Sequence, residues 1–228
     1  MPPRLIRVGS VQQPLVVVDE VSGQVDRIVD LADRMTPFPR VEGGYYPGLR
    51  RHFRAADREA NAYVDHLLNH IAPYVAGAFD VDRFSLLDAS FSMVTDDPGT
   101  LQAPQRAPHF DSTDPNYVAV LHYLNVAQGT GTAFYRQRST GIEQVTEANA
   151  DRFVDTARRE AKDQAAGAGY IQGSDPHYEM IEQVEAVPDR LLIYRGSLLH
   201  CGMIPPSMDR SADPRRGRLT ANIFIKLQ

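Results

Sequence analysis

The feature that most constrains the fold is a change of apolar pattern at Phe84. Before it, residues 54–79 place apolar side chains at helical spacing, with charged residues on the other face. After it, apolar residues alternate or form short runs bounded by turn residues, which is typical of β-strands. The chain is therefore expected to be mainly β, with flanking helices.

The same patterns predict individual elements. Helices are expected over 19–35, 54–79 and 149–166. Strands are expected within 1–18 and over 84–94, 117–124, 132–136, 190–194, 198–203 and 218–227. With no linker visible, residues 1–228 are interpreted as one domain, with N-terminal helical support over about 1–80 and an insertion at about 142–189.

Composition excludes several classes of protein. The 24 basic and 29 acidic residues give a net charge of -5, so no overall field attracts nucleic acid. A single cysteine excludes an intrachain disulfide and fits a reducing cytoplasm. The first ten residues lack the apolar core of a signal peptide, and no apolar run is long enough for a bilayer. We expect a cytoplasmic protein of unknown oligomeric state.

A histidine and an aspartate two positions apart, His109 and Asp111, are the strongest candidates for chemistry. In extended backbone these side chains point to the same side, so imidazole and carboxylate would converge. Two ligands rarely hold a divalent metal, and His200 is expected to supply the third. Two histidines and one carboxylate, with open positions opposite, form the facial triad of non-haem Fe(II) oxygenases.

The remaining candidates for metal ligands are weaker. His66 and His70 lie four apart on the helix predicted over 54–79, but the glutamate of the zinc protease motif is missing, so we expect exposed side chains. His177 lies in a polar segment and is expected at the surface. Cys201, next to the distal histidine, is expected to be a small buried filler.

Five segments in order resemble the Fe(II)/2-oxoglutarate-dependent dioxygenases, and among them the prolyl-hydroxylase-like branch. They are 108–111 with the metal pair, 118–125 ending in Tyr-Leu-Asn, 129–134, 189–200 and 218–224. The resemblance covers roughly the second half of the chain. It departs from the family where 129–132 has Gly-Thr-Gly-Thr instead of Gly-Gly-x-Thr, and in the eighteen positions from His200 to Arg218.

The resemblance implies a double-stranded β-helix, a cupin-like jelly roll, with helices of the first half packed on one sheet. It implies an enzyme that uses Fe(II), 2-oxoglutarate and O2 to hydroxylate an unactivated C–H bond, releasing succinate and CO2. Its metal ligands match His109, Asp111 and His200. Its ligands for the C5 carboxylate of 2-oxoglutarate match Arg218, Thr220 and Tyr123.

Alternatives stay open. Arg210, Arg215 or Arg216 could replace Arg218, and Tyr123 and Thr220 also suit plain packing roles. A cupin-type metal enzyme without 2-oxoglutarate would leave the cation without a partner, and a non-catalytic jelly-roll module would have no need of the triad. Substrates could be peptides, amino acids or other small molecules, whereas nucleic acid is not expected. The insertion at 142–189 is expected to cover the open side of the metal site.

Overall fold

The computed structural model describes residues 2–40, 46–163 and 169–228. The strands are β1 Arg4–Val8, β2 Gln13–Val18, β3 Gly48–His52, β4 Phe84–Val94, β5 Tyr117–Asn125, β6 Gly131–Gln137, β7 Tyr178–Glu185, β8 Leu191–Arg195, β9 His200–Met203 and β10 Leu219–Leu227. The helices are α1 Val25–Arg34, α2 Arg58–Phe79, α3 Ala103–Arg106 and α4 Ala150–Glu160. Short 3-10 turns cover Pro98–Thr100 and Ala161–Asp163.

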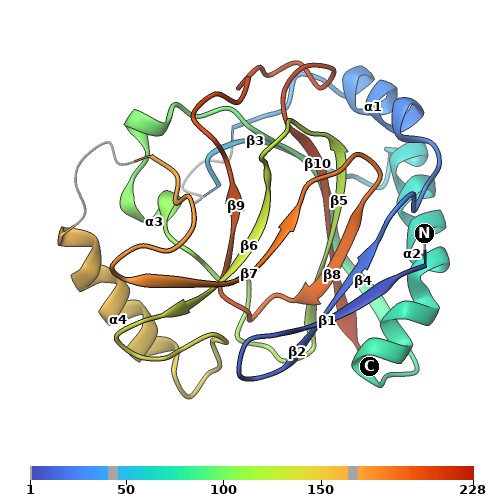
Figure 1. Ribbon diagram of the computed structural model, residues 1–228. Coiled ribbons are helices and arrows are strands. Elements are labelled where there is room, and N and C mark those ends of the chain that lie inside the picture. The colour runs from blue at the N-terminus through green and yellow to red at the C-terminus, as the bar shows by residue number, and fades with distance from the viewer. Residues whose placement is uncertain (1, 41–45, 164–168) are drawn as a thin grey trace.

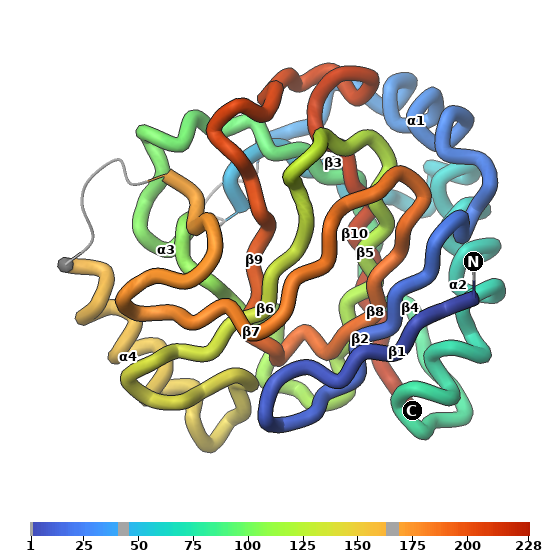
Figure 2. The backbone as a smooth tube through the Cα atoms, viewed as in Figure 1, coloured from blue at the N-terminus to red at the C-terminus, as the bar shows by residue number. Residues whose placement is uncertain are grey.

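Within the described residues the strands form two antiparallel sheets. The larger has seven strands in the order β1-β2-β8-β5-β10-β4-β3, and the smaller has three in the order β7-β6-β9. Figure 2 shows that strands from both ends of the chain, β1 and β10, belong to the large sheet. This is the mainly β architecture that the sequence predicted.

The outer face of the large sheet is covered by α1 and α2 (Figure 1). Alternate residues of β10 face this layer: Ile223 and Ile225 pack with Val64 and Ile71 of α2. Each fully buried side chain of this size contributes about 1.5–3 kcal/mol. The apolar stripe of α2 therefore fixes the helix on the sheet, and the helical support predicted for the first half of the chain is found there.

The inner face of the large sheet meets the small sheet. Leu121 and Tyr123 of β5 and Leu192 of β8 pack with Phe134 of β6 and Val184 of β7. Because side chains alternate along a strand, residues next to these on β5 and β8 belong to the helix-covered face. Two facing sheets with a shared core are the layer arrangement of a jelly roll.

The sequence pattern locates most elements but not all of them. The prediction over 84–94 coincides with β4, and that over 54–79 begins four residues before α2. The helix predicted over 149–166 is α4 followed by a 3-10 turn, and its last three residues lie outside the described residues. Strands β3 and β7 were not predicted, and β7 shows that the segment 142–189 contributes a strand to the small sheet.

A buried chain of hydrogen bonds ties α2 to the sheet. The hydroxyl of Tyr63 on α2 lies 2.7 Å from Nδ1 of His122 on β5, and Nε2 of that imidazole lies 2.9 Å from Asp189. Ser22 donates to the same carboxylate at 2.6 Å. Burial lowers the pKa of His122 although Asp189 opposes the shift. Burial raises the pKa of Asp189, but the donated hydrogen bonds outweigh it and bring the value to about 2.

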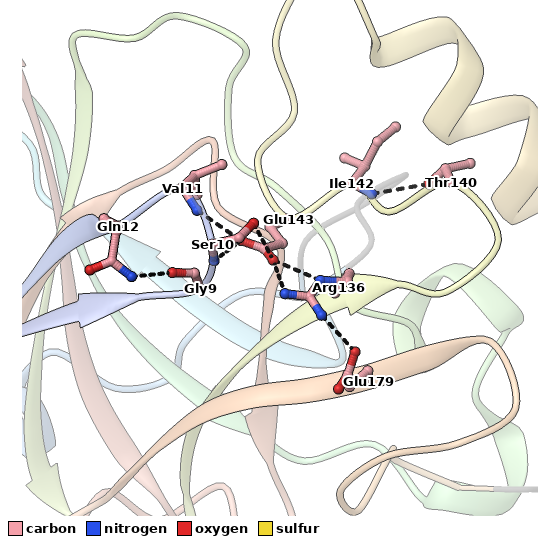
Figure 3. A network of polar contacts seen from close by, with 9 residues as sticks. All are labelled: Gly9, Ser10, Val11, Gln12, Arg136, Thr140, Ile142, Glu143 and Glu179. Carbon is pink, nitrogen blue, oxygen red and sulfur yellow. Dashed lines mark hydrogen bonds and ion pairs between the residues drawn. The ribbon is translucent and has the colours of Figure 1, made fainter.

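A second network holds the β1–β2 hairpin against the small sheet (Figure 3). The buried carboxylate of Glu143 accepts hydrogen bonds from the backbone and hydroxyl of Ser10, at 2.8 and 3.0 Å, and from Nε of Arg136 at 2.7 Å. Arg136 also reaches Glu179 of β7 at 2.9 Å. Burial raises the pKa of Glu143, yet these donors bring it below its ordinary value. Gly9, at φ +64°, leaves the space that the carboxylate occupies.

Among the described residues, none of the helices combines the length and the apolar character that crossing a membrane requires.

Candidate active site

Two backbone hydrogen bonds place the metal pair beside the distal histidine. The amide of His109 donates to the carbonyl of His200 at 2.9 Å, and the amide of His200 donates back at 2.8 Å. The amide of Asp111 donates to Gly196 at 2.7 Å. The segment carrying His-x-Asp therefore runs alongside the start of β9, and its alternate side chains point the same way, as the sequence predicted.

The structure brings His109, Asp111 and His200 together. Their ligand atoms all lie within 4.8 Å of one another, and Nε2 of His200 is 3.7 Å from Asp111. Nδ1 of His200 lies 2.8 Å from the carbonyl of Leu198, which can only accept, so Nδ1 carries the proton. The lone pair of Nε2 then points toward the other two groups, which is the tautomer that a metal ligand requires.

The electrostatics of the triad follow from its position. As whole residues His109 and Asp111 are exposed and His200 is buried, but the Asp111 side chain is only 18% exposed, and all three line the cavity. Burial lowers the pKa of His109 to about 3, and the charges of His200 and Arg50 act in the same direction. Its imidazole is therefore neutral near pH 7, the form that binds a metal. Burial raises the pKa of Asp111, although His200 and Arg50 act against that shift.

The triad opens into a cavity of about 240 Å³, slightly smaller than the sites of drug-sized ligands, which begin near 300 Å³. Arg218 and Thr220 line it as well, both from the strand end where β10 begins. Arg218 is only 6% exposed, and its Nε has no hydrogen-bond partner among the described residues. Its Cζ lies 5.7 Å from the ring of Tyr123, whose hydroxyl is 2.6 Å from Thr132 on the cavity wall.

The three arginines of the preceding loop are engaged outside the cavity. Arg210 donates to Pro206 at 2.8 Å, although its Nε, like that of Arg218, is buried without a partner among the described residues. Arg215 pairs with Asp30 and Asp33 of α1, and Arg216 pairs with Asp209. Of the arginines in 210–218, all of them described, Arg218 alone lines the cavity. The geometry thus favours Arg218 among the four candidates.

Arg50 of β3 is a cavity residue that the sequence did not point to. In the sheet register Arg50 lies opposite Ser92 of β4. Continuing across the sheet, Ser92 lies opposite Thr220 of β10, and Thr220 lies opposite Tyr123 of β5. These four residues, here called the polar row, cross the inner face of the large sheet. Nε of Arg50 donates to Ser92 at 3.0 Å, and its guanidinium lies 4.3 Å from the ring of Tyr46. Leu49 is the only apolar side chain of β3, so its sequence shows no alternation from which a strand could be predicted.

Of the weaker candidates, His66, His70 and Cys201 lie as expected, whereas His177 is half-buried and not at the surface. His66 and His70 are exposed on α2, and Cys201 is buried. His177 faces Glu160 of α4 at 3.9 Å. From the segment 142–189, Tyr170 lines the cavity. That this segment covers the metal site stays a prediction.

The structure has the fold of the non-haem iron, 2-oxoglutarate-dependent oxygenases, and its triad lies together as a metal site of that class requires. HygX from Streptomyces hygroscopicus, solved with nickel, 2-oxoglutarate and hygromycin B bound, is 16% identical, with a TM-score of 0.52 over 95% of this chain and 84% of that one. SnoN from nogalamycin biosynthesis, a non-haem α-ketoglutarate-dependent epimerase, is 13% identical, with a TM-score of 0.54 over 96% and 79%. AviO1 from Streptomyces viridochromogenes Tue57 is 16% identical, with a TM-score of 0.50 over 96% and 90%.

By sequence, the chain belongs to a family of unknown function (DUF6445), whose model matches residues 1–225. No curated protein matches the sequence. The matches to HygX and SnoN, which cover 95% and 96% of this chain, confirm the double-stranded β-helix that the five motifs predicted.

Proposed function

We propose that this protein is an oxygenase that uses Fe(II), O2 and 2-oxoglutarate. His109, Asp111 and His200 would hold the metal, and Arg218 would bind the C5 carboxylate of the cosubstrate. One observation carries the proposal: the triad and a buried arginine without a carboxylate partner among the described residues line the same cavity. A buried charge is costly unless it is paired, and the described residues supply no carboxylate for Arg218, which favours an anionic ligand.

The donor set fits the metal, because Fe(II) accepts imidazole and carboxylate ligands together. When bound, iron and 2-oxoglutarate supply the oxidation of an unactivated C–H bond, with release of succinate and CO2. The Leu198 carbonyl keeps the ring of His200 oriented. The rings of Tyr194 and Phe134, with centroids 4.9 and 6.3 Å from that of His200, limit the water that can approach it.

Arg218 suits the cosubstrate because a planar guanidinium matches a carboxylate in two parallel hydrogen bonds. Thr220, two residues on along β10, presents its hydroxyl to the same face and is proposed as a further ligand of the C5 carboxylate. Tyr123 is proposed to orient this group through its ring, with its hydroxyl turned to Thr132.

The substrate is proposed to be a small molecule or a peptide, and not a nucleic acid. The size of the cavity and the net charge of -5 support this. HygX binds hygromycin B, and SnoN is an epimerase, so relatives in fold act on small molecules and are not limited to hydroxylation. A cytoplasmic location, which the single cysteine favours, completes the proposal.

Anaerobic titration tests this function. Fe(II) is added to the metal-free protein, then 2-oxoglutarate, and the weak visible charge-transfer band of the chelate is followed. We expect a band for the wild type, and neither retained iron nor a band for Asp111→Ala. Asp114→Ala is the matched control, since Asp114 is close in sequence but pairs with Lys226.

The alternatives give different results in the same titration. Stoichiometric iron without a band at saturating 2-oxoglutarate would indicate a cupin-type metal enzyme that uses no such cosubstrate. No iron binding at all would indicate a non-catalytic module. Unchanged iron affinity in Asp111→Ala would mean that the ligands are assigned wrongly.

A further inference from the structure

The cavity is strongly positive although the chain is acidic overall. Arg50, Arg106 and Arg218 line it, and Asp111 is the one carboxylate among its described lining residues. The whole chain has a net charge of -5. A concave site with one sign of charge concentrates ligands of the opposite sign. The proposed cosubstrate accounts for Arg218, so the question is what Arg50 meets.

Arg50 is held in place by neutral groups. Its Nε donates to the hydroxyl of Ser92, which is fully buried, and its guanidinium lies over the ring of Tyr46. Neither terminal nitrogen has a hydrogen-bond partner among the described residues. These contacts fix the direction of the side chain without neutralising its charge.

Other partly buried arginines of the chain are treated differently. Arg51, the next residue on β3, pairs with Asp57 at 2.9 Å. Arg136 pairs with Glu179 at 2.9 Å, and Arg190 pairs with Asp19 at 2.5 Å. Arg195 has no carboxylate, but its nitrogens donate to Gln13 and to the Pro115 carbonyl. Arg50 differs from all four because it lines the cavity and, within the described part of the chain, its two terminal nitrogens have no partner, which indicates a ligand-binding cation.

Arg50 also lies apart from the proposed C5 carboxylate site. In the polar row it is two strands from Thr220, a separation of about 10 Å between backbones. The charges of both arginines act on Tyr46, but of the two only that of Arg50 acts on His109 and Asp111. Arg50 thus lies within reach of the metal ligands, where a substrate must present its reacting bond.

We propose that Arg50 binds a carboxylate of the prime substrate, so that the enzyme oxidises an anionic small molecule or the anionic end of a peptide. This inference rests on the proposed function. Fe(II), Asp111, doubly charged 2-oxoglutarate and Arg218 together carry no net charge, and the described residues then leave Arg50 without a counter-charge. A planar carboxylate fits its two terminal nitrogens in a bidentate geometry.

The test uses Mn(II) in place of iron and a matched pair of probes, N-acetylglycine and N-acetylglycinamide. The protein is loaded with Mn(II) and saturating 2-oxoglutarate, and the affinity for both is measured first. Each probe is then titrated, and the broadening of its proton NMR lines by the bound Mn(II) is recorded. We expect saturable broadening of the acid and none of the amide. Arg50→Gln should weaken acid binding about tenfold or more, as expected for charged hydrogen bonds.

Controls separate the possible outcomes. Arg51→Gln makes the same charge change on the same strand and should leave acid binding unchanged. Arg50→Lys keeps the charge and should retain part of the affinity, which excludes a collapsed site.

Equal broadening of acid and amide, no broadening of either, or undiminished acid binding in Arg50→Gln would overturn the proposal. So would an equal loss of 2-oxoglutarate affinity in Arg50→Gln, because Arg50 would then serve the cosubstrate. Failure of the wild type to bind Mn(II) or 2-oxoglutarate, seen before any probe is added, would instead refute the proposed function itself and the inference with it.

Discussion

Arg218 is a buried cation whose Nε lacks a partner within the described residues, so its ligand should depend on it strongly. Truncating one member of a buried, hydrogen-bonded charge pair costs about 2–5 kcal/mol. We therefore expect Arg218→Gln to weaken the binding free energy of 2-oxoglutarate by about this amount, which raises its Kd at least tenfold. Iron binding should remain intact. Titration of the charge-transfer band at fixed Fe(II) measures both.

Arg215→Gln is the control for this change. It removes the same charge three positions earlier, where the side chain is half exposed and pairs with α1. Its Kd for 2-oxoglutarate should match that of the wild type. A weakened Arg215→Gln or Arg210→Gln beside a normal Arg218→Gln would move the carboxylate ligand into the loop.

Single residues differed in how well the sequence revealed them. The triad could be predicted because two ligands are adjacent in sequence and the third follows a recognisable strand order. Arg50 could not, because its role depends on the register between β3 and β4. Glu143 was equally hidden, since it meets Ser10 only after residues 133 positions apart are brought together. Long-range contacts of this kind leave no local pattern.

Among the elements, the strands inside the large sheet were predictable, whereas two of the four edge strands, β3 and β7, were not. Strands β4, β5 and β10 lie inside the large sheet and carry regular apolar residues. Strands β3 and β7 lie at sheet edges. Arg50 of β3 lines the cavity, and four of the eight residues of β7 are half-buried. Neither shows the alternation that one buried face produces.

The β1–β2 hairpin supplies a prediction at this scale. An alanine at Gly9 would place its Cβ 2.1 Å from Oε2 of Glu143, in a backbone conformation with φ +64°. We expect Gly9→Ala to cost about 1–2 kcal/mol for the left-handed conformation and about 1–3 kcal/mol for the clash. Urea unfolding of the variant measures the sum.

Gly23 provides the matched control. It has φ +62°, but no atom lies within 4 Å of its Cβ position. Gly23→Ala should therefore lose only the conformational part. Equal losses in the two variants would show that the hairpin moves away from Glu143 at little cost.

At the scale of the whole molecule, the helical layer and the sheet are joined by the buried histidine at position 122. Because its folded pKa lies below the ordinary 6.5, the unfolded chain takes up a proton first as the pH falls. The free energy of unfolding should therefore be full above about pH 6.5 and decline below it. Denaturant unfolding between about pH 7.5 and 5 measures the slope.

His122→Gln, which keeps hydrogen-bonding groups but cannot titrate, should reduce that slope, and the remainder is expected from His109, whose pKa is also lowered. His66→Gln should leave the slope unchanged, because His66 is exposed on α2. If the slope is undiminished in His122→Gln, the acid sensitivity arises elsewhere. That residues 1–228 form one domain also stays a prediction. A single cooperative transition in these experiments would support it, since strands from both ends of the chain share one sheet.

The reciprocal backbone hydrogen bonds between His109 and His200 bear on how the protein should respond to loss of the proposed metal. Main-chain hydrogen bonds hold the two ligand-bearing segments together, so we expect the proposed metal site to keep its shape without the ion. Many small metal domains unfold when their ion leaves. If this protein binds iron as proposed, an ion that is oxidised and released should be replaced by a fresh one without a new round of folding. Inactivation by metal loss should accordingly be repairable, and the protein should tolerate repeated cycles of stripping and reloading.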